Sequence, residues 1–153
     1  MREKGKLLFL FLFAFMAGGV NAVDSKMGTE AEAKALLERA VNLMRVDEVM
    51  ALTMITIPGT GFHQKDLYPF CLDNKGVLMA HPSQLGRSLI DVVTDDGVKV
   101  AKIMLKNAQE GKISKISYVF PRIREGKESN KSAKKTSFYT RVGNHVCASG
   151  FYQ

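Results

Sequence analysis

Cysteine chemistry is the first possibility that the residue types raise. The chain contains two cysteines, Cys71 and Cys147. Neither lies in a C-x-x-C or C-x-x-C-H motif, so the sequence indicates neither a thioredoxin-like redox site nor covalently attached c-type haem. Outside the cytoplasm such a pair can oxidise to a disulfide. The alternative is two buried free thiols, which behave as small apolar side chains.

The sequence contains no recognisable motif for metal binding or for catalysis. The histidines His63, His81 and His145 are widely separated, and none has a close-spaced partner ligand. There is no nucleophile elbow, phosphate-binding loop or zinc-protease helix motif. The adjacent Asp95 and Asp96 precede a predicted helix, where capping explains them better than acid-base chemistry. The sequence therefore predicts no metal site, no cofactor and no enzymatic activity.

The N-terminus predicts export. Three basic side chains within residues 1–6 precede an unbroken apolar run at 7–17, and residues 20–22 present the small side chains that signal peptidase reads. The run is shorter than the roughly 20 apolar residues that span a bilayer. We therefore expect a cleaved signal peptide at residues 1–22 and one mature domain, residues 23–153, in the periplasm. An uncleaved N-terminal anchor is the alternative.

The charge distribution restricts the class of partner. The formal net charge is +7. Removal of residues 1–22 takes away three basic side chains and one acidic one, which leaves +5. Much of the remaining positive charge lies in residues 122–135, RIREGKESNKSAKK. Basic runs can bind nucleic acid or anionic surfaces, but export argues against nucleic acid, and the lack of apolar spacing favours a solvated basic loop.

A long amphipathic helix is predicted at the start of the mature chain. Thr29 and Glu32 form a capping-box pattern, and apolar residues follow at helical spacing as far as Met44. We expect one helix from Glu30 to Ile55, ended by the Pro-Gly-Thr-Gly turn at residues 58–61.

Strands dominate the rest of the chain. Helical patterns predict a short turn at residues 88–91 and a helix at 98–109, which Asp95 or Asp96 would cap and Gly111 would end. Helices segregated from strands indicate an α+β domain. A glycine-first turn joins the last two strands in a hairpin. The predicted strands are residues 67–72, 77–80, 113–120, 136–142 and 145–152.

Short motifs in a fixed order resemble one family. From about residue 31 to residue 152 the chain is similar to the single-Cache family of extracytoplasmic sensor domains. Each motif is short, but their order and spacing cover nearly the whole mature chain. The motifs are Leu67-Tyr68-Pro69-Phe70, Asp73-x-x-Gly76, Ala80-His81-Pro82, Leu85-Gly86-Arg87-Ser88-Leu89, Asp96-Gly97, Tyr118, Lys135-Thr136-Ser137-Phe138 and Ala148-Ser149-Gly150-Phe151-Tyr152.

The resemblance implies a PAS-like fold and a ligand-sensing function. A long N-terminal helix would pack behind a five-stranded antiparallel sheet, with a pocket between the other sheet face and the segment joining the second and third strands. Members of the family usually sense small organic molecules, often short carboxylates, for chemoreceptors and histidine kinases. Because no membrane helix or output module follows the last strand, the chain resembles a stand-alone periplasmic form. Such a form would pass its bound state to a membrane histidine kinase, chemoreceptor or transporter.

An interaction subunit without a small ligand is the alternative function. Its long helix and a sheet edge would contact a membrane protein or a second copy of the chain. Homodimers through the helix are common in the family, so dimerisation alone fits both functions.

The pocket that the resemblance implies would hold an anion through a few fixed donors and an apolar lining. Lys135 matches a lysine of the family, or it continues the solvated basic run. His81 could donate to a ligand, or only satisfy backbone groups of its loop. The strands that carry the two cysteines would be neighbours, which makes a disulfide possible. The ligand-binding candidates are His81, Tyr118, Arg122 and Lys135 as donors, and Phe70, Phe120 and Phe138 as apolar walls.

Overall fold

The computed structural model describes residues 26–124 and 127–153. The predicted signal peptide, residues 1–22, lies outside the described residues. No helix within the described ranges is long and apolar enough to cross a bilayer. The elements in chain order are α1 (Glu30–Val46), α2 (Glu48–Thr56), β1 (Pro69–Leu72), β2 (Leu78–Ala80), α3 (Val100–Asn107), β3 (Ser114–Arg124), β4 (Lys127–Val142) and β5 (His145–Tyr152).

The N-terminal helix is divided in two. α1 begins as predicted, because the Thr29 side chain accepts the N–H of Glu32 and the Glu32 side chain accepts the N–H of Thr29. It ends at Asp47, whose backbone is extended and whose carboxylate accepts the N–H of Met50 and caps α2. The prediction of one helix from Glu30 to Ile55 is therefore wrong. Apolar spacing continues across the junction, whereas the short acidic side chain of Asp47 favours a cap.

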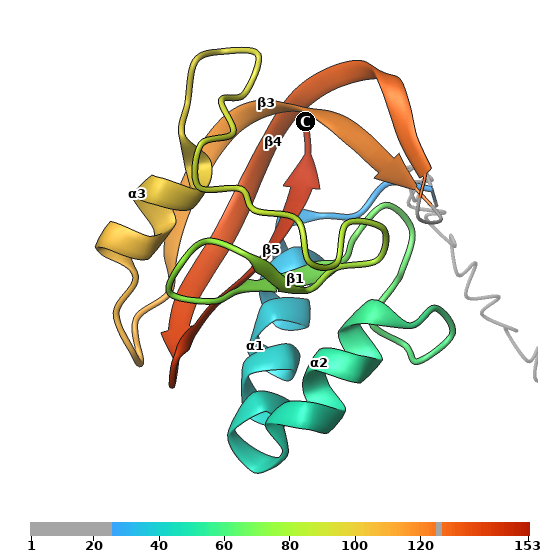
Figure 1. Cartoon of the computed structure of the whole chain (residues 1–153). Coiled ribbons are helices and arrows are strands. Elements are labelled where there is room, and N and C mark those ends of the chain that lie inside the picture. The colour runs from blue at the N-terminus through green and yellow to red at the C-terminus, as the bar shows by residue number, and fades with distance from the viewer. Residues whose placement is uncertain (1–25, 125–126) are drawn as a thin grey trace, which may run out of the picture.

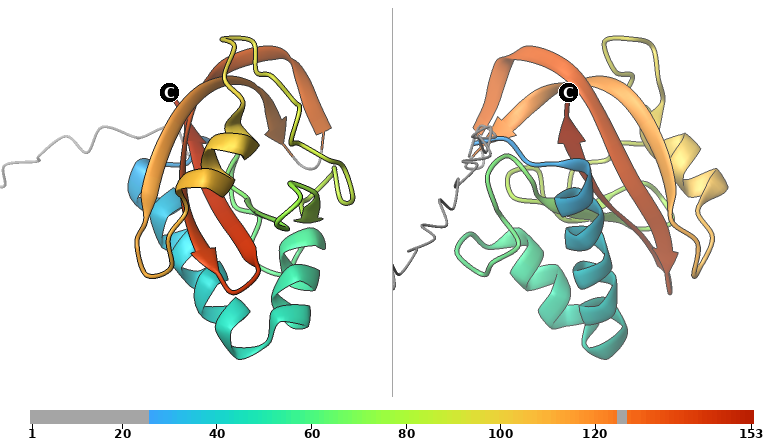
Figure 2. Two further views of the ribbon diagram at one scale, coloured as in Figure 1. Left: turned by 60° about the vertical axis from the view of Figure 1, so that its left-hand side comes forward. Right: turned by 180° about the vertical axis from the view of Figure 1, so that it is seen from behind.

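All five strands form one antiparallel sheet in the order β2-β1-β5-β4-β3. The helices α1 and α2 cover one face, and α3 with the connection from β2 lies over the other face (Figure 1, Figure 2). Side chains alternate between the two faces, as strand geometry requires. Cys71 packs with α1 and α2, whereas its neighbours Phe70 and Leu72 pack toward α3. The predicted α+β architecture, N-terminal helices on a five-stranded antiparallel sheet, is confirmed.

Strands β3 and β4 form a hairpin longer than the sequence predicts. Their pairing extends from Ser114 opposite Tyr139 to Arg124 opposite Lys127. The prediction of a solvated basic loop at residues 122–135 is therefore wrong for the described part of that segment. A hairpin that extends past the covered part of a sheet needs no apolar face, so the usual alternation is missing from its sequence.

Helix α3 also differs from its prediction. It begins after Lys99, which makes no side-chain cap, and neither aspartate of the predicted pair caps it. Asp96 instead accepts the N–H of Val119 on β3 at 3.0 Å, which ties the connection to the sheet. The helix ends before Gly111, which lies in the following turn with φ 76°. Residues 88–91 form no helical turn, and Ser88 makes an isolated bridge instead.

Cys71 and Cys147 form a disulfide between β1 and β5. The two residues are direct cross-strand partners, and both side chains are buried under α1 and α2. The bond closes a loop across a sequence separation of 76, which restricts the unfolded chain strongly. It also holds β1, the strand that carries Phe70, against the centre of the sheet.

Candidate ligand-binding site

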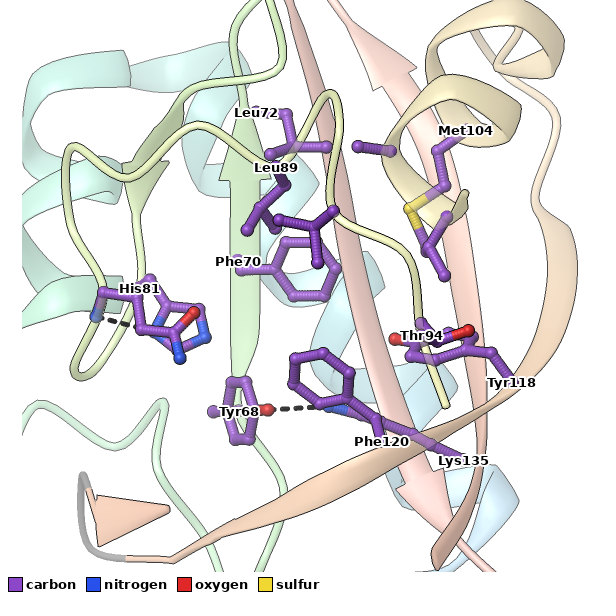
Figure 3. Close-up of a pocket in the computed structure, with 14 residues that line it drawn as sticks. Tyr68, Phe70, Leu72, His81, Leu89, Thr94, Met104, Tyr118, Phe120 and Lys135 are labelled. Carbon is purple, nitrogen blue, oxygen red and sulfur yellow. Dashed lines mark hydrogen bonds between the residues drawn. The ribbon is translucent and has the colours of Figure 1, made fainter. Parts of the chain in front are cut away.

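A small cavity lies between the sheet and α3, on the face opposite to α1 and α2 (Figure 3). Its volume is about 40 Å³, which is room for roughly three water molecules. Side chains from β1, β3, β4, α3 and the connection between β2 and α3 enclose it. The lining residues are Tyr68, Phe70, Leu72, His81, Gln84, Leu89, Val92, Thr94, Val100, Ala101, Met104, Tyr118, Phe120 and Lys135.

Lys135 is the one charged side chain among the described residues that line the cavity. It is 1% exposed, and its Nζ donates a hydrogen bond to the Tyr68 hydroxyl oxygen (2.7 Å). The same Nζ lies 5.0 Å from the centre of the Tyr152 ring. No described carboxylate forms an ion pair with the ammonium. Burial lowers the pKa of Lys135 to about 7, although the charge of Asp66 acts in the opposite direction.

His81 presents a neutral donor. Its Nδ1 accepts the backbone N–H groups of Ser83 and Gln84, both at 3.1 Å, so in the neutral ring the proton is on Nε2. Burial, and then the charge of Lys135, lower the pKa of His81 to about 3. The two alternatives for His81 are therefore compatible: Nδ1 orders the loop that follows β2, while the ring contributes to the cavity wall.

Aromatic side chains form much of the remaining wall. The Tyr118 hydroxyl forms a hydrogen bond with the Ser137 hydroxyl (2.8 Å), and its ring packs edge-on against Phe120. Burial raises the pKa of Tyr118 far above its ordinary value, so this side chain stays neutral. Tyr68 packs edge-on against His81, with ring centres 5.2 Å apart. Figure 3 shows Tyr68, Phe120 and Lys135 meeting at one end of the cavity, and Thr94 and Met104 lining the part that faces α3.

Five of the seven predicted site residues line this cavity: Phe70, His81, Tyr118, Phe120 and Lys135. Phe138 does not. It lies three positions after the cavity-lining Lys135 on β4, so it points to the opposite face and stacks on Phe151 beneath α1. Arg122 does not line it either, because it lies 3.7 Å from the Asp66 carboxylate and over the Tyr152 ring. The structure therefore places neither residue at this cavity.

Several lining residues were not found from the sequence. Tyr68 lies two residues before Phe70, and strand periodicity could have placed both side chains on one face. Gln84, Leu89 and Thr94 lie in the irregular connection after β2, which has no periodicity to read. Only the path of that connection across the sheet brings them to the cavity.

The arrangement suits binding of a small anion. It combines one titratable ammonium, neutral donors and an apolar lining in a small cavity. Within residues 26–124 and 127–153, no group of three or more histidine, cysteine, aspartate or glutamate side chains is placed to hold a metal ion.

Comparisons with known proteins agree with this fold. A sequence profile described as a Cache domain matches residues 28–148. None of the curated proteins matches the chain. A methyl-accepting chemotaxis protein from Vibrio parahaemolyticus superimposes with a TM-score of 0.63 at 20% identity, over 80% of this chain and 86% of that one. A Cache chemosensory domain described for carboxylic acid recognition gives 0.56 at 20% identity, over 78% and 85%. The periplasmic sensor domain of a chemotaxis protein gives 0.55 at 19% identity, over 78% and 87%.

Proposed function

Because the chain belongs to the Cache domain family, we propose that it is a periplasmic sensor-type protein that binds a short monocarboxylate in the cavity below α3. The observation that supports this proposal most directly is the position of Lys135. Its ammonium is buried at the cavity wall and has no paired carboxylate among the described residues. One solved structure of the same fold belongs to a domain described for carboxylic acid recognition, which is consistent with this ligand class.

The charge of Lys135 supports an anion as the ligand. A buried, unpaired ammonium is unfavourable, and its cost appears here as the lowered pKa of Lys135. A carboxylate beside Nζ would accept charge-assisted hydrogen bonds and restore the charged form. Neutral donors such as His81 Nε2–H would bind the second oxygen without competing for the negative charge.

The size and lining of the cavity support a ligand with one charged end and a very short apolar tail. About 40 Å³ accommodates a molecule of roughly the size of acetate or propionate. Phe70, Leu72 and Met104 offer apolar contacts to the tail. A dicarboxylate would leave its second charge against these side chains, which is costly. An amino acid would bring an ammonium close to Lys135, which is also unfavourable.

We further propose that the protein acts outside the cytoplasm, after cleavage of residues 1–22, and that residues 23–153 form its single domain. The Cys71–Cys147 disulfide supports an oxidising compartment. In this proposal the bound state is presented to a membrane histidine kinase, chemoreceptor or transporter, and the protein performs no catalysis.

One observation favours the alternative of an interaction subunit. Val46, Val49, Met50 and Ile57, at the end of α1 and on α2, are between 50% and 84% exposed. A cluster of exposed apolar side chains is typical of a surface that contacts another protein. This function would need no ligand in the cavity, so the two proposals differ in one measurable property.

The test is a thermal-shift titration of the protein purified after export. Acetate, propionate and pyruvate are compared with succinate and glycine. A ligand at 100 times its dissociation constant stabilises the native state by about 2.7 kcal/mol, which raises Tm by several degrees. We expect a saturable shift with the monocarboxylates, lost in Lys135→Met and retained in the control Lys134→Met, whose side chain is exposed. If no carboxylate shifts Tm, or if Lys135→Met keeps the shift, the ligand proposal fails and the interaction subunit is favoured.

A further inference from the structure

Asp66 is a buried carboxylate just before β1 that the cavity itself does not use. It is 4% exposed. Its Oδ1 accepts the backbone N–H of Gly28 at 2.6 Å. Its Oδ2 has no hydrogen-bond partner among the described residues and lies 3.7 Å from Arg122 Nη1. A buried carboxylate with one unsatisfied oxygen is costly, so its position calls for a physical reason.

The first contact of Asp66 is with the segment that enters α1. Gly28 directly precedes the cap residue Thr29 and is itself buried. A Cβ at position 28 would lie 2.1 Å from Leu67 Cγ, so only glycine lets the chain pass this close to the residue beside Asp66. Arg122 reinforces the attachment by donating to the Met27 sulfur at 2.8 Å. The segment that enters α1 is therefore attached to Asp66 through Gly28 and to Arg122 through Met27.

The second interaction of Asp66 is electrostatic and reaches the cavity. Its charge raises the pKa of Lys135 against the larger effect of burial. Lys135 and Arg122 pack on the same ring, since Lys135 Nζ is 5.0 Å and Arg122 Cζ is 5.1 Å from the Tyr152 ring centre, and Arg122 Nη1 lies 3.7 Å from the Asp66 carboxylate. The Asp66 carboxylate is therefore linked to Lys135 through Arg122 and the Tyr152 ring, and it contacts Gly28 directly through Oδ1.

Other groups around Lys135 do not compete for this role. Tyr68 accepts its hydrogen bond, and burial raises the pKa values of Tyr118 and Tyr152, so these two phenols stay neutral. His81 is neutral above a pKa of about 3. Of the charged side chains around Lys135, Asp66 is the carboxylate whose attraction stabilises the ammonium.

We propose that Asp66 couples the charge state of the ligand cavity to the segment that enters α1, through its hydrogen bond to Gly28. Binding of an anion compensates the charge of Lys135, which weakens the attraction that the ammonium exerts on Asp66. The carboxylate then interacts more strongly with Gly28 and Arg122. Deprotonation of Lys135 also weakens this attraction on Asp66, and it does so without any ligand. The predicted response to a ligand rests on the proposed function, whereas the predicted response to deprotonation of Lys135 does not.

The Gly28 amide is a direct probe of this coupling. In the ¹⁵N-labelled protein purified after export, we expect the Gly28 amide resonance to shift on saturation with acetate. In acetate-free buffer it should also shift with pH, with a midpoint near the Lys135 pKa of about 7. Lys135→Met should lose both responses. Asp66→Asn should lose both as well, since an uncharged amide does not respond to the charge on Lys135.

The control is Glu30→Gln, which changes a charge in the first turn of the same helix, where Glu30 contacts Lys115 and not the Asp66 segment. It should keep both responses. The inference is overturned if acetate raises Tm while Gly28 stays unchanged, or if Asp66→Asn responds as wild type does. If no carboxylate binds, the proposed ligand is wrong, but the pH titration of Gly28 still decides the coupling. Should Asp66→Asn fail to fold, the ¹³C resonance of the Asp66 carboxyl group in the wild-type protein decides: a pH-dependent shift with a midpoint near the Lys135 pKa of about 7 supports the coupling, and a resonance that does not respond overturns it.

Discussion

Lys135 Nζ donates a hydrogen bond of 2.7 Å to the hydroxyl oxygen of Tyr68, although 67 positions separate the two residues in the sequence. The bond joins β4 to the segment that leads into β1, at one end of the cavity (Figure 3). It gives the buried ammonium one neutral acceptor and leaves its charge without a paired carboxylate. This arrangement gives the site a positive charge that is not neutralised by the protein, so an anionic ligand can pair with it.

Tyr68→Phe tests the contribution of that acceptor. The substitution leaves a buried donor unsatisfied, which should lower the free energy of unfolding by about 1–3 kcal/mol. It should also lower the pKa of Lys135 further, because the charged form loses a hydrogen bond. Urea unfolding measures the first effect, and the pH dependence of acetate binding measures the second. Unchanged stability and an unchanged pH midpoint would show that the bond contributes nothing.

The affinity for a carboxylate should depend on pH. The ammonium form of Lys135 binds the anion, and its pKa in the empty site is about 7. We expect constant affinity from pH 5.5 to 6.5 and a decrease of about tenfold per pH unit above pH 8. Since His81 has a pKa of about 3, it adds no transition in this range. Calorimetric titrations at several pH values make the measurement, and affinity that stays constant up to pH 9 would contradict it.

The stability of the ligand-free protein should depend on the same group. Lys135 has a pKa of about 7 in the folded protein and an ordinary value of 10.5. Between these values the unfolded chain binds more protons than the folded one, so the free energy of unfolding rises with pH. Lys135→Met should remove this rise, and the exposed control Lys134→Met should keep it. Urea unfolding at pH 7 and pH 9.5 compares the three proteins.

A matched pair of phenylalanines tests which sheet face binds the ligand. Phe70 and Phe138 are similarly buried, at 6% and 7% exposure, but Phe70 faces the cavity and Phe138 faces α1. Leucine at either position should lower the free energy of unfolding by roughly 1–2 kcal/mol. Only Phe70→Leu should change the affinity for acetate. Equal effects on affinity would contradict the placement of the site.

Reduction of the disulfide should destabilise the domain. Because the bond spans a separation of 76 residues, its loss should cost about 2–5 kcal/mol. A reducing agent should therefore lower Tm of the wild-type protein and leave Tm of the double variant Cys71→Ala/Cys147→Ala unchanged. A wild-type Tm that does not respond to complete reduction, verified by thiol labelling, would show that packing alone holds β1 to β5.

Local patterns determined the elements whose signals lie close together in sequence. Thr29 and Glu32 predicted the start of α1, and Gly143 predicted the hairpin before β5. Errors arose where two local signals compete. Apolar spacing predicted a continuous helix where Asp47 caps a second one. The polar composition of residues 127–134 predicted a loop where hydrogen bonds to β3 form a strand. Backbone pairing can stabilise such a strand without the apolar alternation that sequence analysis recognises.

By itself the sequence determined the fold class, because helix and strand periodicity reflect interactions between near neighbours. Its resemblance to the Cache family then singled out five residues that line the cavity. The tertiary structure decided what those residues can do. In the sequence Lys135 is the last residue of a basic run, and only the pairing of β4 with β3 and β5 buries it. Phe138 resembles Phe70 in type, and the position of each in its strand places them on opposite faces. Burial, pKa and orientation depend on residues distant in sequence, so they exist only in the folded chain.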